Sequence, residues 1–214
     1  MKTEKCCYLE YWEGKGAEKN YSTPFQIEVF GRYVDRTADI LDVGCGYGRV
    51  MRELLGNGYA KVQGVEPSVS LRDRGAAGDG SLSIAALENG RIPFPDNSFD
   101  AVLLIAVLTC IPQDGEQDAL LAEIHRVLRP GGIIYINDFL LNTDQRNLDR
   151  YAEYESVHGC YGIFELEGGG VLRHFSDERM TGMLSPFKTE EYEKVIYTTM
   201  NGNKSNGFYY IGRK

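Results

Sequence analysis

The sequence has few cysteines and no long hydrophobic run. Its five cysteines form no C-x-x-C pair, so we expect neither a disulfide framework nor a zinc site. The longest apolar run extends from Ala101 to Leu108 and is far short of the ~20 residues of a membrane span. Residues 1–7 contain no apolar signal segment. The sequence therefore predicts a cytoplasmic protein with reduced thiols, no metal and no membrane association.

Basic residues are also too few for a surface that binds nucleic acid. The chain has 23 lysines and arginines against 31 aspartates and glutamates, which gives a net charge of -8. Binding to a polyanion needs a cationic surface that releases counterions. The expected partner is therefore a small molecule, and the composition leaves the oligomeric state open.

The 214 residues suit one α/β domain, because short apolar strands alternate with amphipathic helices. The predicted strands lie at 40–43, 62–66, 81–87, 101–106 and 133–137. Such alternation predicts right-handed crossovers and a doubly wound, mostly parallel sheet. Two further strands, 190–200 and 206–213, flank a turn at Asn201-Gly202-Asn203 and predict an antiparallel hairpin at the sheet edge.

Two segments depart from this rhythm. Residues 1–22 are expected to form an N-terminal arm, and residues 140–175, rich in aromatics and glycine, an insertion. Both are expected to cover the active site. Between them, Thr23-Pro24-Phe25-Gln26 has the pattern of a capped helix start.

A glycine-rich turn and an acidic residue indicate a nucleoside cofactor. Gly44-Cys45-Gly46-Tyr47-Gly48 follows the first strand and precedes a helix, whose N-terminus offers free N–H groups to a ligand. Glu66 ends the second strand, where a carboxylate can accept hydrogen bonds from both ribose hydroxyls. A nicotinamide fingerprint would place a third glycine at Arg49, which disfavours an NAD-linked oxidoreductase.

With these features the sequence resembles the class I S-adenosylmethionine (SAM)-dependent methyltransferase family. The resemblance rests on four motifs in order. They are Ile40-Leu41-Asp42-Val43-Gly44-Cys45-Gly46-Tyr47-Gly48-Arg49, Val65-Glu66-Pro67-Ser68, Ile92-Pro93-Phe94-Pro95-Asp96-Asn97-Ser98-Phe99-Asp100 and Arg126-Val127-Leu128-Arg129-Pro130-Gly131-Gly132. It implies a Rossmann-like sheet of seven strands, SAM as cofactor and S-adenosylhomocysteine as product.

The resemblance also implies roles for individual residues. Asp42 would orient the amino group of SAM, Glu66 would hold the ribose, and Glu88 would contact the adenine amino group. Ala106 and Leu108 would line the sulfonium and substrate side. The full implied cofactor set is Asp42, Gly44, Cys45, Gly46, Gly48, Glu66, Pro67, Leu87, Glu88, Ala106 and Leu108.

The methyl acceptor is not evident from the sequence. Its expected pocket draws on Trp12, Lys19 and Tyr21 of the arm and on Arg150, Tyr151 and Tyr161 of the insertion. Their aromatic rings either stack on a planar or cationic acceptor or form a satellite core under a long loop.

Methyl transfer is an in-line displacement that needs a base only if the acceptor must lose a proton. Asp138, after the fifth strand, is the best single candidate for a catalytic role, and His158 and His174 in the insertion are further candidates. A SAM-binding sensor or partner protein without catalysis is the alternative function. An arsenic methyltransferase, suggested by Cys6-Cys7 alone, is a narrower variant.

Overall fold

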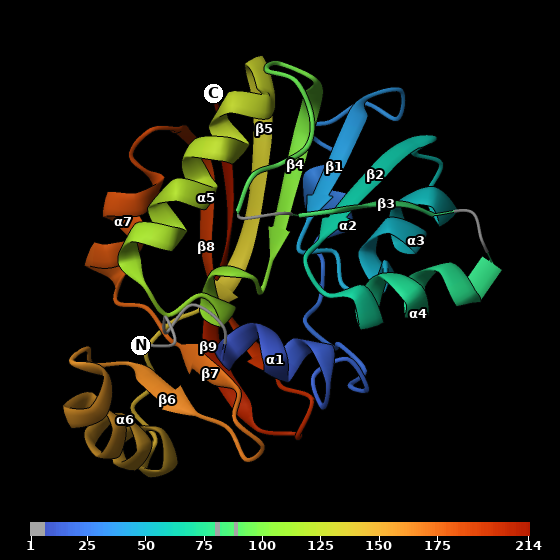
Figure 1. The fold of residues 1–214 in the computed structure, drawn as a ribbon. Coiled ribbons are helices and arrows are strands. Elements are labelled where there is room, and N and C mark those ends of the chain that lie inside the picture. The colour runs from blue at the N-terminus through green and yellow to red at the C-terminus, as the bar shows by residue number, and fades with distance from the viewer. Residues whose placement is uncertain (1–6, 80–81, 88–89) are drawn as a thin grey trace.

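The computed structural model describes residues 7–79, 82–87 and 90–214 (Figure 1). At its centre is a seven-stranded sheet of order β3-β2-β1-β4-β5-β9-β8. The strands are β1 (Asp39–Val43), β2 (Lys61–Glu66), β3 (Ser83–Ala86), β4 (Phe99–Ile105), β5 (Leu128–Phe139), β8 (Lys188–Thr198) and β9 (Lys204–Arg213). The first five run parallel, and β9 runs antiparallel to both β5 and β8. This topology confirms the predicted doubly wound sheet with an antiparallel C-terminal hairpin.

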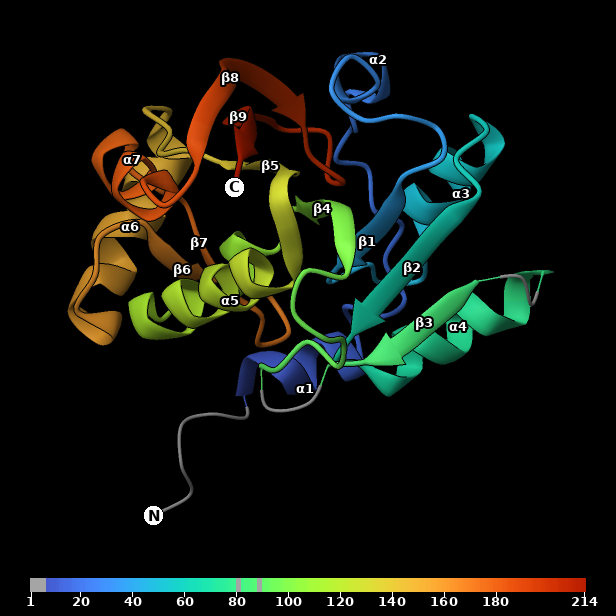
Figure 2. The same cartoon turned by 90° about the horizontal axis from the view of Figure 1, so that it is seen from above.

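Helices cover both faces of the sheet (Figure 2). The helices are α1 (Cys7–Glu13), α2 (Ile27–Phe30), α3 (Arg49–Gly56), α4 (Val69–Asp79), α5 (Asp114–Val127), α6 (Gln145–His158) and α7 (Asp177–Leu184), with a 3-10 turn η2 (Leu108–Cys110). Helices α5 and α7 pack on one face, and α2 and α3 pack on the other. Two hydrophobic cores result, one on each side of the sheet.

Strand β1 shows how the sequence serves both cores. Leu41 and Val43 point into the core beneath α5, and Ile40 points into the core beneath α3, because successive side chains alternate between the faces of a strand. Asp42 shares the face of Ile40 and is 2% exposed. The carboxyl group of Asp42 therefore occupies a position where the alternation of the strand predicts an apolar side chain. This position is near the end of β1, just before the glycine turn.

The predicted helix start at Thr23 is wrong. Helix α2 has only four residues, begins at Ile27 and has no side-chain cap. The preceding carbonyl groups are used elsewhere, since Thr23 O accepts from Arg49 and Pro24 O accepts from Asn137 Nδ2 at 2.6 Å. Phe25 packs against Tyr135 with ring centroids 5.0 Å apart. These tertiary contacts with the sheet and α3 outweigh the local capping signal.

The segment 140–175 forms α6 and a small antiparallel hairpin of β6 (Ile163–Glu165) and β7 (Val171–Arg173). Together with α1 it lies toward the carboxyl ends of the parallel strands (Figure 1). Helix α1 is joined to the start of α4, where Glu13 Oε1 accepts from Val69 N at 2.7 Å. In the described part of the chain, no helix combines the length and apolar character needed to cross a membrane.

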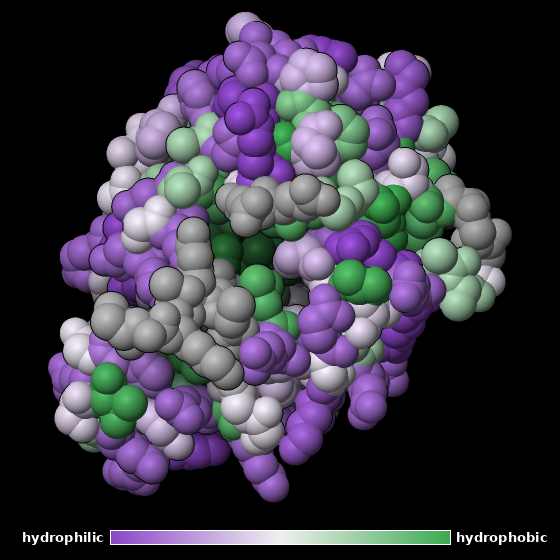
Figure 3. All heavy atoms as spheres, viewed as in Figure 1, coloured by the Kyte–Doolittle hydropathy of each residue, from purple (hydrophilic) through white to green (hydrophobic). Residues whose placement is uncertain are grey.

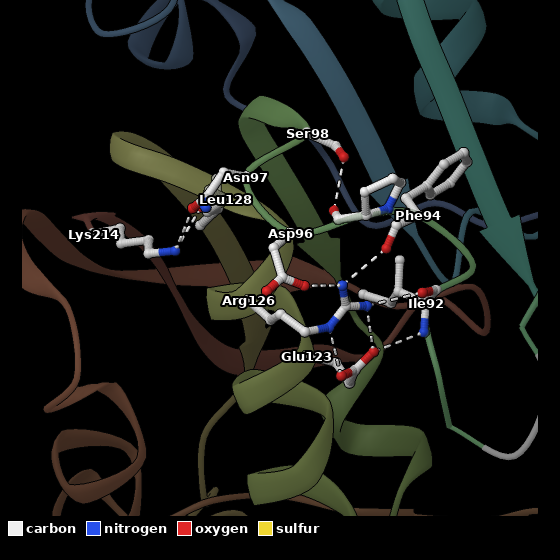
Figure 4. A network of polar contacts seen from close by, with 10 residues as sticks. Ile92, Phe94, Asp96, Asn97, Ser98, Glu123, Arg126, Leu128 and Lys214 are labelled. Atoms are coloured by element: carbon white, nitrogen blue, oxygen red, sulfur yellow. Dashed lines mark hydrogen bonds and ion pairs between the residues drawn. The ribbon is translucent and has the colours of Figure 1, made fainter.

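Arg126 joins two of the sequence motifs into one structure (Figure 4). Its guanidinium donates to Phe94 O at 2.8 Å and to Ile92 O at 3.0 Å, and it forms ion pairs with Asp96 and Glu123. Glu123 Oε2 in turn accepts from Ile92 N at 3.1 Å. The loop before β4 is thereby fixed to the C-terminal half of α5.

Candidate active site

The turn between β1 and α3 depends on glycine at its key positions. Gly44, Gly46 and Gly48 have φ of +67°, +57° and +79°, and side chains rarely adopt this left-handed region. A Cβ on Gly44 would lie 2.6 Å from Val107 Cγ2. The turn therefore brings bare backbone to the carboxyl edge of the sheet, immediately before the N-terminus of α3.

Glu66 is fixed at the end of β2 by two backbone groups. Its Oε2 accepts from Gly46 N and its Oε1 from Ser68 N, both at 2.9 Å. The side chain is buried, and burial raises its pKa above the ordinary value. Each carboxylate oxygen keeps acceptor capacity beyond one hydrogen bond. Glu66 thus links the glycine turn to β2 and can still accept hydroxyl groups of a ligand.

Asp42 lies near the turn without a hydrogen-bond donor of its own among the described residues. Burial raises its pKa to about 7, an effect that the charge of Arg49 partly offsets. A buried carboxyl group without a hydrogen-bond or ion-pair partner is energetically costly. An ammonium group bound beside Asp42 would relieve this cost, and the amino group of SAM meets that requirement.

These residues open onto a cavity of about 930 Å³. Figure 3 shows a hollow at the centre of this face, with hydrophobic residues at its depth. One end is formed by the glycine turn, Asp42 and Glu66. The other end is formed by α6, β6, the residue after β7, and the β8–β9 turn. Its lining residues include Arg146, Arg150, Phe164, His174, Met200 and Ser205.

Most of the expected cofactor residues line this cavity. They are Asp42, Gly44, Cys45, Gly46, Glu66, Pro67, Leu87 and Ala106. Gly48 instead packs beneath Leu82, and Leu108 is fully buried in the hydrophobic core under α5. The expected adenine contact, Glu88, lies outside the described residues, as does Cys6.

The expected acceptor residues divide into two groups. Trp12, Tyr21 and Arg150 line the cavity. Lys19 is exposed and Tyr161 is 42% exposed, and neither belongs to the cavity wall. Tyr151 is fully buried behind the wall, where its hydroxyl contacts His174 Nδ1 at 2.5 Å. It acts on the cavity through that histidine and through the neighbouring Arg150 and Phe164.

Asp138, the catalytic candidate, is placed behind the cavity wall. It is fully buried, and its carboxyl group accepts from Thr109 N at 3.2 Å and from Phe139 N at 2.8 Å. Burial raises its pKa to about 7. Asp138 therefore positions η2, whose residues Thr109 and Cys110 line the cavity, and is not itself part of the cavity lining.

Several cavity residues carry no signal in the sequence. Thr109 and Cys110 follow β4, Phe139 ends β5, His174 follows β7, and Thr199 belongs to the β8–β9 turn. They come from elements far apart in the chain that meet only through the sheet order. His174 lies in the insertion, and no local sequence pattern marks it.

A seven-stranded sheet of this order, with a glycine turn after β1 and an acidic residue ending β2, is the Rossmann-like fold of SAM-dependent methyltransferases. The comparisons agree. Residues 41–136 match the family described as "Methyltransferase domain". A SAM-dependent methyltransferase from Methanosarcina mazei superposes with a TM-score of 0.83 at 25% identity, over 90% of this chain and 99% of that one. The chain thus contains the methyltransferase domain of this family over residues 41–136 and has the fold of the SAM-dependent methyltransferases, a class whose cofactor is SAM.

Other similar proteins act on different acceptors. The sterol 24-C-methyltransferase of Yarrowia lipolytica is 31% identical over 80% of this chain and 44% of its own length. The 1,6-didemethyltoxoflavin-N1-methyltransferase of Burkholderia thailandensis, solved with S-adenosylhomocysteine, gives a TM-score of 0.64 at 17% identity, over 96% of this chain and 79% of that one. The matches with the curated relatives span from about a fifth to about half of those relatives' length. These names do not assign an acceptor to this chain.

Proposed function

We propose that this protein transfers the methyl group of SAM to a small-molecule acceptor held between the glycine turn and the insertion. The observation that carries the proposal is the shape of the cavity. Its volume of about 930 Å³ lies near the upper end of small-molecule sites. It continues from the cofactor residues to a separate wall built by α6, β6 and the β8–β9 turn.

Each end of the cavity has a distinct task in this proposal. Asp42 pairs with the amino group of SAM, Glu66 accepts the ribose hydroxyls, and the backbone of residues 44–46 contacts the amino-acid part. SAM supplies the methyl group, which passes to the acceptor by in-line displacement. The arm, through Trp12 and Tyr21, and the insertion cover the site and exclude water. A fixed orientation of the acceptor lowers the barrier by up to ~7–11 kcal/mol.

A small apolar acceptor fits the wall better than a macromolecule. Val107, Ile111, Phe139, Leu166 and Leu172 line the middle and the insertion end. The sterol substrate named for the Yarrowia relative is also apolar. The net charge of -8 adds no attraction for a nucleic acid.

Calorimetry with SAM tests the cofactor half of the proposal. We expect Glu66→Ala to weaken SAM binding by roughly 10–100-fold, because hydrogen bonds to a charged group contribute ~1.5–3 kcal/mol. Glu28→Ala removes the same charge from an exposed site on α2 and serves as the control. Equal SAM affinity of the Glu66 variant and the control would remove Glu66 from this role.

Release of S-adenosylhomocysteine from a broad metabolite panel tests the transfer itself. A small molecule that supports turnover is the expected result. SAM binding without turnover on any member of the panel would favour the alternative, a sensor or partner protein that binds SAM without catalysis.

A further inference from the structure

Two arginines of α6 lie at the insertion end of the cavity, and one of them, Arg150, has no ion-pair partner among the described residues. Arg146 and Arg150 of α6 both line this end. Arg146 forms an ion pair with the exposed Asp144, whose carboxylate oxygen lies 3.8 Å from its Nε. Arg150 forms no ion pair with any described carboxylate, and its buried Nε has no hydrogen-bond partner there. Its guanidinium lies over the ring of Phe164, 3.4 Å from the centroid.

The acidic residues of the cavity wall are on other elements. Asp42 and Glu66 belong to β1 and β2, and Glu116 and Glu123 belong to α5. Glu123 is engaged by Arg126. The cofactor end thus combines Asp42 and Glu66 with Arg49, and the end at α6 carries Arg146 and Arg150.

His174 lies beside Arg150 and is held in one tautomer. Tyr151 Oη lies 2.5 Å from its Nδ1, and Asn142 Nδ2 lies 3.2 Å from the same atom. The Tyr151 hydroxyl already accepts from Asn142 N at 3.3 Å, so its own proton is free to point at Nδ1. Asn142 Oδ1 accepts from Asn206 N at 2.7 Å, which turns the Asn142 amide nitrogen toward the ring.

Nδ1 of His174 is therefore an acceptor, and the proton of the neutral ring is on Nε2. Burial and the neighbouring Arg150 lower the pKa of His174 to about 3, which keeps the ring neutral at pH 7. The ring is 5% exposed, lies between Phe139 and Phe164, and forms part of the cavity wall. Its Nε2 has no partner among the described residues. His174 can thus donate a hydrogen bond into the cavity, but Nε2 cannot take a proton from an acceptor.

We propose that this end of the cavity binds an anionic oxygen group of the methyl acceptor, a carboxylate or a phosphate, through the Arg150 guanidinium and the His174 Nε2–H. An arginine without a carboxylate partner favours such oxygens over a neutral or cationic group. The cationic acceptor considered from the aromatic residues alone is disfavoured by Arg146 and Arg150. The inference rests on the proposed function, and it makes the acceptor an amphiphile with an apolar body and an anionic end directed away from SAM.

Calorimetry on the protein saturated with S-adenosylhomocysteine tests this inference. Four probes share one apolar body: 4-phenylbutyrate, 4-phenylbutyl phosphate, the neutral 4-phenylbutanamide and the cationic 4-phenylbutylamine. We expect at least one anionic probe to bind about tenfold or more tightly than the amide, and the amine to bind most weakly. The carboxylate and the phosphate compared with each other identify the preferred anion.

Matched variants connect the preference to the residues. Arg150→Gln should reduce the affinity for the preferred anion about tenfold and leave the affinity for S-adenosylhomocysteine unchanged. Arg32→Gln removes the same charge from an exposed site and should change neither. Nitrogen-15 NMR of His174 should show an unprotonated Nδ1 and a protonated Nε2 between about pH 5 and pH 8.

Three results would overturn the inference. They are equal binding of the amide and the anions, the absence of anion binding, and an Arg150→Gln variant with wild-type anion affinity. Failure to bind S-adenosylhomocysteine in the first step would instead contradict the proposed function. The two failures are therefore distinguishable.

Discussion

Gly44 shows how a single position sets the cofactor turn. Its φ of +67° disfavours any side chain, and a Cβ would meet Val107 at 2.6 Å. Gly58 has a similar φ of +86° but nothing within 4 Å of the added atom. Comparing an alanine substitution at each glycine therefore separates the energetic cost of the left-handed backbone from the cost of a steric clash.

We expect Gly58→Ala to lower the free energy of unfolding by about 1–2 kcal/mol through the left-handed backbone alone. Gly44→Ala should cost roughly 1–3 kcal/mol more because of the overpacking against Val107, and it should also weaken SAM binding. Urea unfolding and SAM calorimetry on both variants check this. Equal destabilisation by the two substitutions would show that Val107 moves aside without cost.

At the scale of elements, Arg126 connects α5 with the loop before β4. The loop carbonyls of Ile92 and Phe94 and the carboxylate of Glu123 all converge on its guanidinium (Figure 4). Gly90, Arg91 and Glu123 line the cavity, so this connection also shapes the cavity wall.

We expect Arg126→Ala to lower the free energy of unfolding by about 2–4 kcal/mol, because two carbonyl groups and Glu123 lose a charged partner. Arg32→Ala, on an exposed site, should stay within about 0.5 kcal/mol of wild type. Denaturant titration measures both values. A loss below 1 kcal/mol for Arg126→Ala would mean that the loop is held by apolar packing alone.

The elements also show what the sequence could and could not predict. The strands around Asp42 and Leu103 were predictable, because continuous apolar runs between helical stripes are typical of a buried parallel sheet. The start of α2 was predicted wrongly, since the capping signal at Thr23 is local and its carbonyl contact with Arg49 is not. The cofactor end follows β1 and β2 in the chain and was therefore accessible to motifs. His174 and Cys110 reach the cavity only through the packing of β7 against η2, and no sequence pattern records that packing.

For the whole molecule, buried carboxyl groups connect stability to pH. Burial raises the pKa of Asp138 from 3.8 to about 7. Between pH 3.8 and about 7 the folded state therefore binds more protons than the unfolded state. The stabilising contribution of Asp138 to the free energy of unfolding is complete below about pH 4 and is lost as pH rises through about 7. Asp42 contributes with the same sign.

Asp138→Asn removes this titration and leaves the other groups in place. We expect the difference in free energy of unfolding between wild type and variant to be largest near pH 4–5. This difference should narrow by roughly 1–4 kcal/mol by pH 8. Unfolding measured in both proteins across this range tests the sign. Asp73→Asn, at an exposed site, should show no such change. A gap for Asp138→Asn that widens with pH would mean that the carboxylate is held charged by its backbone donors.

The position of β9 between β5 and β8 has a consequence for synthesis of the chain. Strand β8 leaves the ribosome before β9, yet β9 is its neighbour in the sheet. Until residues 204–213 emerge, β5 presents an open hydrogen-bonding edge and β8 has no strand to pair with. Unpaired edges of this kind are sites of intermolecular association. Translation that stops before Lys204 is therefore expected to yield an aggregation-prone polypeptide, although every cofactor motif has already been made.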